Sequence, residues 1–156
     1  FDLSNAVYPK YAPRYEKTTG IPRPLIKPMI HGRRSKGMLG MYKGQILATL
    51  RIMKAVAHHV GLPFVFPTDE NKKPVTTVYG DLFDGAFHGA HTHMHITRKK
   101  WDVAGFEDQT IILLLTEPDL AKEFPSLVEC FDLTNPAWVE WLEERKASWK
   151  WEEIGW

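Results

Sequence analysis

The sequence has little of several features that define common classes of protein. Cys130 is the single cysteine among 156 residues, which excludes an intramolecular disulfide or a cluster of thiolate metal ligands and favours a reducing compartment. The longest apolar runs, such as TIILLLT at residues 110–116, are far too short to cross a bilayer. We therefore expect a soluble protein without a membrane span.

Catalytic signatures are also lacking. The sequence contains no nucleophile elbow, paired-carboxylate signature, HExxH motif or dinucleotide fingerprint. The glycine-rich segment HGRRSKGMLGMYKG at residues 31–44 is not a nucleotide-binding P-loop, because no strand is predicted before it and the spacing before a Lys-Ser/Thr pair is missing. We expect no catalytic residue, no cofactor and no small-molecule substrate.

Charge is plentiful but segregated along the chain. Residues 1–45 contain nine Lys/Arg against two Asp/Glu, residues 46–100 seven against four, and residues 101–156 four against thirteen. The three segments carry net charges of +7, +3 and −9, although the whole chain has a net charge of only +1. This pattern is typical of a basic end that meets an anion and an acidic end that faces solvent or a protein partner.

The basic end combines proline, tyrosine and cations. Residues 8–28 contain five prolines and little apolar periodicity, so we expect them to run extended over a surface without forming a core of their own. Such an extension can follow a phosphate backbone and stack on exposed bases. The alternative is a proline-rich tail without a partner.

Periodicity predicts the main elements of the central segment. Apolar residues at helical spacing predict a helix over residues 41–60, with Gly61 as its stop. Residues 75–83 and 87–97 are predicted to form two strands of a hairpin around an Asp-Gly turn, and residues 110–116 a buried strand. Asn135 followed by Pro136 predicts the start of a C-terminal helix.

A cluster of histidines invites two functional interpretations. In the predicted second strand, His91, His93 and His95 share one face, and three bases follow at residues 98–100. Imidazoles at this spacing can bind a divalent metal, and the start of the segment resembles half of the cupin motif. The carboxylate expected next is replaced by ITRKK, whose cations would repel a dication. We favour a cationic surface for folded RNA, and a half-exposed strand without a partner remains the third alternative.

The C-terminal end is rich in tryptophan. Five of the six tryptophans lie in the last nineteen residues. A helix with so many large aromatics docks either on the chain's own core or on a neighbour. We favour a neighbour, because Trp149, Trp151 and Trp156 do not share one helical face.

The order of several short motifs is similar to that of a known family. The motifs are IPRPLIKP at 21–28, GMYKG at 40–44, YGDLFD at 79–84, ITR at 96–98, DVAGFED at 102–108 and ILLLTEPDL at 112–120. In this succession the chain resembles the large-subunit ribosomal protein family numbered twenty-eight in the bacterial scheme, in a divergent mitochondrial form. The basic Trp-Lys-Pro segment of that family is missing here, and the predicted helix at 41–60 resembles an insertion.

The resemblance implies a function and a location. It implies a structural constituent of the mitochondrial large ribosomal subunit, in the matrix, that binds ribosomal RNA and other large-subunit proteins without catalysis. The rivals are a subunit of another mitochondrial complex and a small cupin-like protein that binds a metal through histidines.

These observations predict an α+β fold. We expect an extended basic arm at residues 1–36, a small core with a β-hairpin or sheet and a few packed helices at 37–134, and a docking helix at 135–156. The residues expected to bind RNA are Arg14, Arg23, Lys27, Arg33, Arg34, Lys36, Lys43, His91, His93, His95, Arg98, Lys99 and Lys100. The residues expected to dock on a protein are Trp138, Trp141, Trp149, Trp151 and Trp156.

Overall fold

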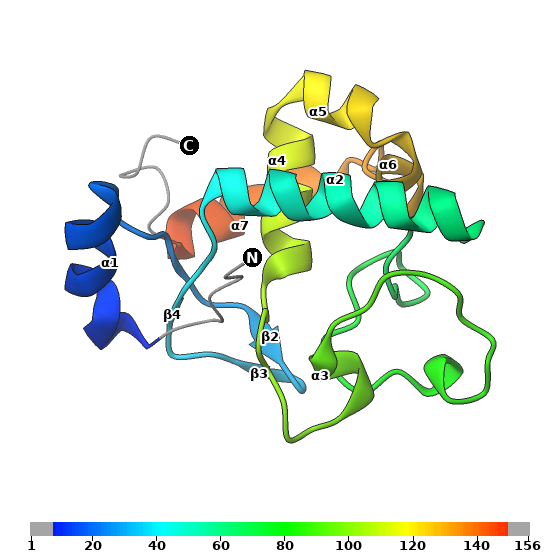
Figure 1. Ribbon diagram of the computed structural model, residues 1–156, viewed down its shortest axis with the longest axis horizontal. Helices are drawn as coiled ribbons and strands as arrows, with labels where there is room; N and C mark the ends of the chain where they lie inside the picture. Colours follow the sequence, from blue (N-terminus) through cyan, green and yellow to red (C-terminus); the bar gives the residue numbers. More distant parts are fainter. Residues whose placement is uncertain (1–7, 150–156) are drawn as a thin grey trace.

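The computed structural model describes residues 8–149 and shows an α+β fold, as predicted. Its described part contains seven α-helices and two short antiparallel strand pairs (Figure 1). The helices are α1 (Ala12–Thr19), α2 (Lys43–Val60), α3 (His93–Ile96), α4 (Phe106–Thr116), α5 (Pro118–Glu123), α6 (Pro125–Cys130) and α7 (Ala137–Ser148), and the 3₁₀ helices are η1 (Pro9–Tyr11) and η2 (Gly80–Leu82). The strands are β1 (Leu25–Ile26), β2 (Met29–Ile30), β3 (Arg33–Arg34) and β4 (Met38–Leu39).

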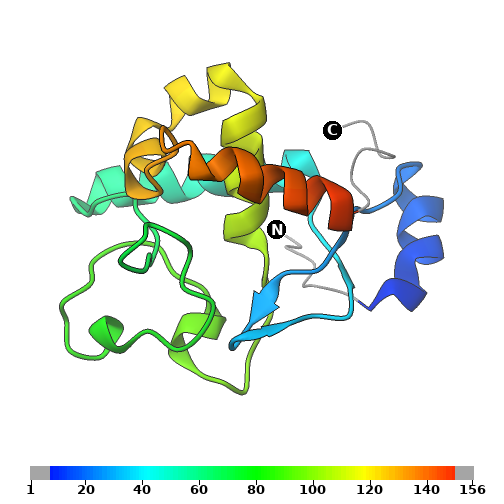
Figure 2. The same cartoon turned by 180° about the vertical axis from the view of Figure 1, so that it is seen from behind.

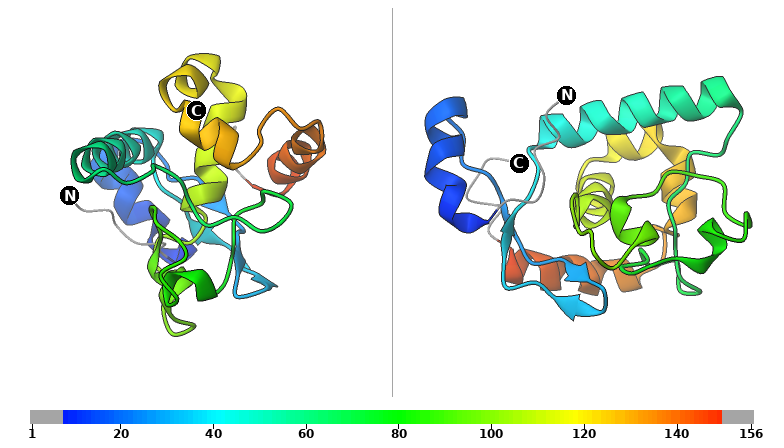
Figure 3. Two further views of the ribbon diagram at one scale, coloured as in Figure 1. Left: turned by 90° about the vertical axis from the view of Figure 1, so that its right-hand side faces the viewer. Right: turned by 60° about the horizontal axis from the view of Figure 1, so that its bottom comes forward.

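Helix α4 lies at the centre of the fold. The left view of Figure 3 shows it between α2 on one side and α7 on the other, and in Figure 2, the view from behind, α7 crosses in front of it. All nine residues from 106 to 114 are buried, so this part of the helix has no face in solvent. The predicted strand at residues 110–116 is wrong in type, because these residues belong to α4, whereas the predicted burial is confirmed for residues 110–114. An apolar run that is buried on every side has no helical period to reveal it.

The main hydrophobic core surrounds α4. Ile46 and Leu50 of α2 are buried against it, and Phe66 stacks on Phe131 with ring centroids 6.3 Å apart. Trp138 of α7 belongs to the same cluster. Burying one such large side chain contributes about 1.5–3 kcal/mol, so this cluster is the main source of stability for the fold.

The four strands form one irregular hairpin, whose tip is the lowest blue ribbon of Figure 1. Leu25 pairs with Leu39 at the end of the hairpin far from the turn, and Ile30 pairs with Arg33 next to the turn. Two residues separate β1 from β2, but three separate β3 from β4, so the return strand carries one extra residue. This is a β-bulge, a feature that bends a strand and redirects its side chains.

The N-terminal arm is only partly extended. The prediction of an extended arm is wrong for residues 12–19, which form α1. Ile26 is buried in a second core cluster, so the arm also contributes to a core. Tyr42, at the start of α2, holds α1 in place: its hydroxyl donates to the Ile21 carbonyl and hydrogen-bonds the Thr19 hydroxyl.

The hairpin predicted at residues 75–97 does not form. Gly85 adopts a left-handed φ of 69°, as a turn requires, but the flanking segments do not pair. Residues 93–96 form helix α3 instead, because His95 Nδ1 accepts a hydrogen bond from the Thr92 backbone N–H and caps the first turn. This cap competes with the strand that alternation predicted.

Two other helix predictions are confirmed. Helix α2 spans Lys43–Val60 and ends at Gly61, whose φ is 71°. Helix α7 begins after Asn135, whose side-chain Oδ1 accepts a hydrogen bond from the Ala137 N–H. Within residues 8–149, none of the helices combines the length and the apolar character that a bilayer span requires.

Candidate nucleic-acid interface

The tip of the hairpin is a two-residue turn made by His31 and Gly32. Both residues have positive φ, 49° and 77°, which is the geometry of a type I′ turn and matches the twist of the two flanking strands. The His31 backbone N–H also donates to the Thr76 carbonyl, at 2.6 Å. The turn therefore has a fixed position relative to the rest of the fold.

The His31 side chain joins this hairpin to a distant basic turn. Its Nε2 lies 3.3 Å from the carbonyl oxygen of Lys100, 69 residues further along the chain. Since a carbonyl can only accept, Nε2 carries the proton and donates. The contact places the bases at 33–36 beside those at 98–100 (Figure 1).

We call the resulting group of exposed bases the cationic surface. It consists of Arg33, Lys36, Arg98, Lys99 and Lys100, all exposed. None of the five forms an ion pair with another residue in the described part of the chain. Their charges are therefore directed outward, and this arrangement is suited to binding a polyanion.

Two other predicted RNA contacts have carboxylate partners within the protein. Arg34 pairs with Glu144 of α7, and Lys43 pairs with Glu117 between α4 and α5. Glu144 Oε2 also lies 3.3 Å from Arg145 Nη1. These pairs hold elements of the protein together and leave less net charge for an external anion.

The remaining predicted bases divide by exposure. Arg14 is exposed on α1 and Lys27 is half-buried. Arg23, by contrast, is only 4% exposed: its Nε donates to the Gly40 carbonyl at 2.7 Å, and its guanidinium lies 4.8 Å from the Tyr15 ring and 5.6 Å from the Tyr42 ring. The structure therefore assigns Arg23 to the anchoring of the arm and removes it from the predicted RNA contacts.

The three histidines do not share one face, because α3 replaces the strand. His95 is fully buried. Its Nδ1 accepts from Thr92, so the proton lies on Nε2, which donates to the Val75 carbonyl at 2.7 Å. Burial lowers the pKa of His95, in keeping with a neutral ring. The prediction that His95 contacts RNA is therefore wrong, because His95 is a buried structural residue, whereas His91 and His93 are exposed.

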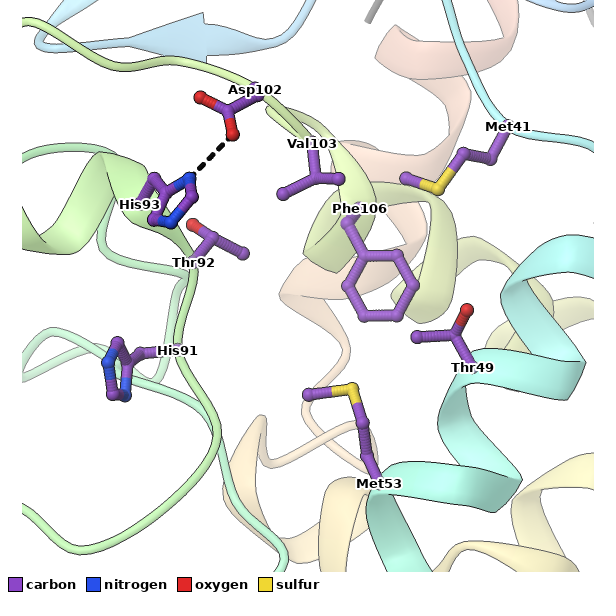
Figure 4. Close-up of a pocket in the computed structure, with 9 residues that line it drawn as sticks. All are labelled: Met41, Thr49, Met53, His91, Thr92, His93, Asp102, Val103 and Phe106. Carbon is purple, nitrogen blue, oxygen red and sulfur yellow. Dashed lines mark hydrogen bonds and ion pairs between the residues drawn. The ribbon is translucent and has the colours of Figure 1, made fainter. Parts of the chain in front are cut away.

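His93 pairs with a carboxylate beside a small hollow (Figure 4). Its Nδ1 donates to Asp102 Oδ2 at 2.6 Å, and this hydrogen bond is the main reason why the pKa of Asp102 is lowered. The hollow has a volume of about 310 Å³ and is lined mainly by apolar groups such as Met41, Met53 and Phe106.

The arrangement near this hollow does not provide a metal cage. In Figure 4 the His91 ring turns away from Met53 and Phe106, and His95 is fixed in the interior. Among residues 8–149, no group of three or more His, Cys, Asp or Glu side chains is placed to hold a metal ion. The cationic surface is therefore the stronger candidate site.

The tryptophans of α7 mostly face the protein itself. Trp138 is 4% exposed, and its Nε1–H donates to the Phe131 carbonyl at 2.9 Å. Trp149 is 3% exposed and belongs to the second core cluster, while Trp141 is half-buried. The structure thus assigns Trp138 and Trp149 to the chain's own core instead of a neighbour. The predicted docking residues Trp151 and Trp156 lie outside the described residues.

Sequence reasoning missed several residues of this region. His31 was not predicted to take part; the available signal was Gly32 after a residue type that tolerates positive φ, which is weaker than an Asn-Gly pair. Trp101 was missed because its neighbours come from segments far away in the sequence: its ring centroid lies 6.0 Å from that of Tyr8. No local pattern reveals such a contact.

Comparison with known proteins identifies no relative. No protein-family model matches the chain, and neither a curated protein nor a solved structure matches it.

Proposed function

We propose that the protein is an RNA-binding structural constituent of the mitochondrial large ribosomal subunit and acts without catalysis. The observation that carries the proposal is the hydrogen bond from His31 to the Lys100 carbonyl, which unites two basic segments into the cationic surface. Ribosomal RNA would bind there, and neighbouring ribosomal proteins would contact other faces of the molecule.

The cations of the cationic surface are held on ordered backbone. Arg33 lies on a hairpin that is hydrogen-bonded at its turn, and Lys100 is held at its carbonyl by His31, so the backbone that carries the cations is ordered before a partner arrives. Preorganisation reduces the entropy lost on binding. Each Lys or Arg that neutralises a phosphate also releases a condensed counterion, which favours binding at low salt.

Acidic groups lie close to one part of the cationic surface. Glu140 and Glu143 are exposed on α7, and Glu144 of the same helix pairs with Arg34 of β3. These carboxylates would repel a phosphate backbone, so RNA would approach the cationic surface from the side away from α7.

The motif order described above supports the ribosomal assignment less directly. Two of its segments, residues 79–84 and 112–120, differ in secondary structure from the hairpin and the strand that were predicted in those regions. Among the motif residues, only Arg98 belongs to the cationic surface. The proposal therefore depends mainly on the surface and secondarily on the succession of motifs.

Salt-dependent binding tests the RNA assignment. Fluorescence anisotropy would measure the affinity of the protein for organellar large-subunit ribosomal RNA over a range of salt concentrations. The triple variant Arg33→Ala, Lys99→Ala, Lys100→Ala should bind more weakly and with a salt slope smaller by roughly 2–3, because each lost phosphate contact removes about 0.7–0.9 from the slope.

A matched variant controls for net charge. The triple variant Arg51→Ala, Lys54→Ala, Lys122→Ala removes three exposed cations from α2 and α5, which lie above the hairpin in Figure 1. Two of these cations, Arg51 and Lys122, form ion pairs with Glu123 and Asp119. This variant should keep the slope of the unaltered protein. Equal salt slopes for the two triple variants would show that RNA does not bind at the cationic surface. The proposal would also be overturned if polyglutamate competed with the labelled RNA as effectively as unlabelled RNA does.

A further inference from the structure

A second feature adjoins the cationic surface. A hollow of about 550 Å³ opens between the N-terminal 3₁₀ helix, the bulged hairpin and the turn that follows Lys100. Its lining includes Tyr8, Pro9, Ile30, Lys36, Met38 and Trp101. The volume falls within the range of about 300–1,000 Å³ that is usual for small-molecule sites.

Two aromatic rings form the walls of this hollow. The centroids of Tyr8 and Trp101 are 6.0 Å apart and their planes meet at 70°, so the rings contact edge to face. Tyr8 is 58% exposed and Trp101 is half-buried. In this geometry the edge of one ring meets a face of the other, and a flat ligand can stack on a ring face outside this contact.

Cations surround the aromatic walls. Lys36 lies in the β-bulge, which directs it to the hollow, and the Lys10 ammonium lies 5.8 Å from the Tyr8 ring centroid. Lys100 directly precedes Trp101 and is tied to the hairpin through His31. Aromatic faces for stacking beside cations for phosphates are the combination that binds single-stranded nucleic acid.

We propose that this hollow accepts one unpaired nucleobase of the bound RNA, stacked on the aromatic walls, while the adjoining phosphates contact Lys36 and Lys100. This inference rests on the proposed function. An acidic peptide would satisfy the cations but leave the apolar lining formed by Ile30 and Met38 without a partner, so a base is the better match to the whole hollow.

The test separates base recognition from phosphate binding. The probes are a fluorescein-labelled single-stranded RNA of about ten nucleotides, within the roughly 4–16 usual for such sites, and an abasic strand of equal length and charge. The unaltered protein should bind the RNA roughly 5- to 150-fold more tightly than the abasic strand, the ratio expected for one stacked base.

Two variants locate the effect. Trp101→Leu and Tyr8→Ala should each bring the ratio of affinities toward one while the salt slope stays unchanged. Tyr8→Ala is included because its exposed ring can be removed without loss of the fold, whereas Trp101 is partly packed against the core.

The possible failures are distinguishable. Equal, salt-dependent binding of both strands by the unaltered protein would refute the base site and leave the cationic surface intact. A base preference that survives both aromatic substitutions would also refute it, because another part of the protein would then hold the base. Absence of binding to either strand would refute the proposed function as well.

Discussion

Replacing Glu107 with glutamine should flatten the pH dependence of stability between pH 6 and pH 8. Glu107 lies in the first turn of α4 and is 2% exposed. Its Oε1 has no hydrogen-bond partner among residues 8–149. Burial is the main cause that raises the pKa of Glu107 to about 8, and the neighbouring charge of Asp108 adds to it. The folded protein therefore keeps Glu107 protonated at neutral pH.

The sign and size of the effect follow from linkage. The unfolded chain releases this proton near the ordinary value of 4.5, so between about pH 4.5 and pH 8 the folded state holds one more proton than the unfolded state. The stabilisation of the folded state by this extra proton is complete below pH 4.5 and is lost as the pH rises through 8. At about 1.4 kcal/mol per pH unit, reduced near the pKa, the loss from pH 6 to pH 8 is about 2 kcal/mol.

Urea denaturation at several pH values measures this difference. The free energy of unfolding of the unaltered protein should fall by the stated amount relative to Glu107→Gln, since the amide does not titrate. Glu140→Gln makes the same change at an exposed position of α7 and should leave the profile parallel to that of the unaltered protein. If the Glu107→Gln and unaltered profiles run parallel, Glu107 does not retain its proton in the folded state and the reasoning is wrong.

Three further substitutions test the packing around α4. Trp138→Ala should lower the free energy of unfolding in urea by about 3–5 kcal/mol. Val139→Ala, at a side chain that is 67% exposed, should change it by less than about 0.5 kcal/mol. A similarly small change for both variants would show that Trp138 is not a core residue. Gly105→Ala should lower the melting temperature, because Gly105 has a φ of 83° and a Cβ there would lie 2.8 Å from Ile26 Cδ1; an unchanged value would contradict that close contact. Arg145→Ala should lower the free energy of unfolding in urea by about 3–5 kcal/mol, because Arg145 Nε lies 3.8 Å from Oδ2 of the buried Asp108, which would lose this cation. Recovery of stability at pH values that protonate Asp108 would identify the lost cation as the cause.

The elements that could be predicted are those whose structure is determined by a few neighbouring residues. The helix at 41–60 was predictable because one face is buried and the other is not, and because Gly61 ends it. Asn135 likewise marks the start of α7 through its own side-chain hydrogen bond. In both places the sequence within a few residues contains the physical cause of the structure.

Elements decided by their surroundings were not predictable in this way. Residues 106–114 of α4 are buried on all sides, so they show no helical period in the sequence. The Asp-Gly pair at 84–85 forms a turn, but a hairpin also needs flanking strands that pair, and the cap of α3 at Thr92 prevents one of them.

The candidate site shows the same limit. The bases at 33–36 and 98–100 are evident in the sequence, but their proximity depends on the hydrogen bond from His31 to Lys100. Conversely, Arg23 and His95 match the sequence pattern of an RNA contact and are buried in the fold. Charge indicates the kind of ligand, whereas only the tertiary structure shows which charges reach it.

The central claim is that this protein is part of a ribonucleoprotein particle. Sedimentation of the tagged protein from mitochondrial lysate, with and without ribonuclease, tests it most directly. The account predicts that the protein migrates with the large-subunit ribosomal RNA and is released to light fractions after ribonuclease treatment. A small species whose sedimentation is the same with and without ribonuclease would contradict the account.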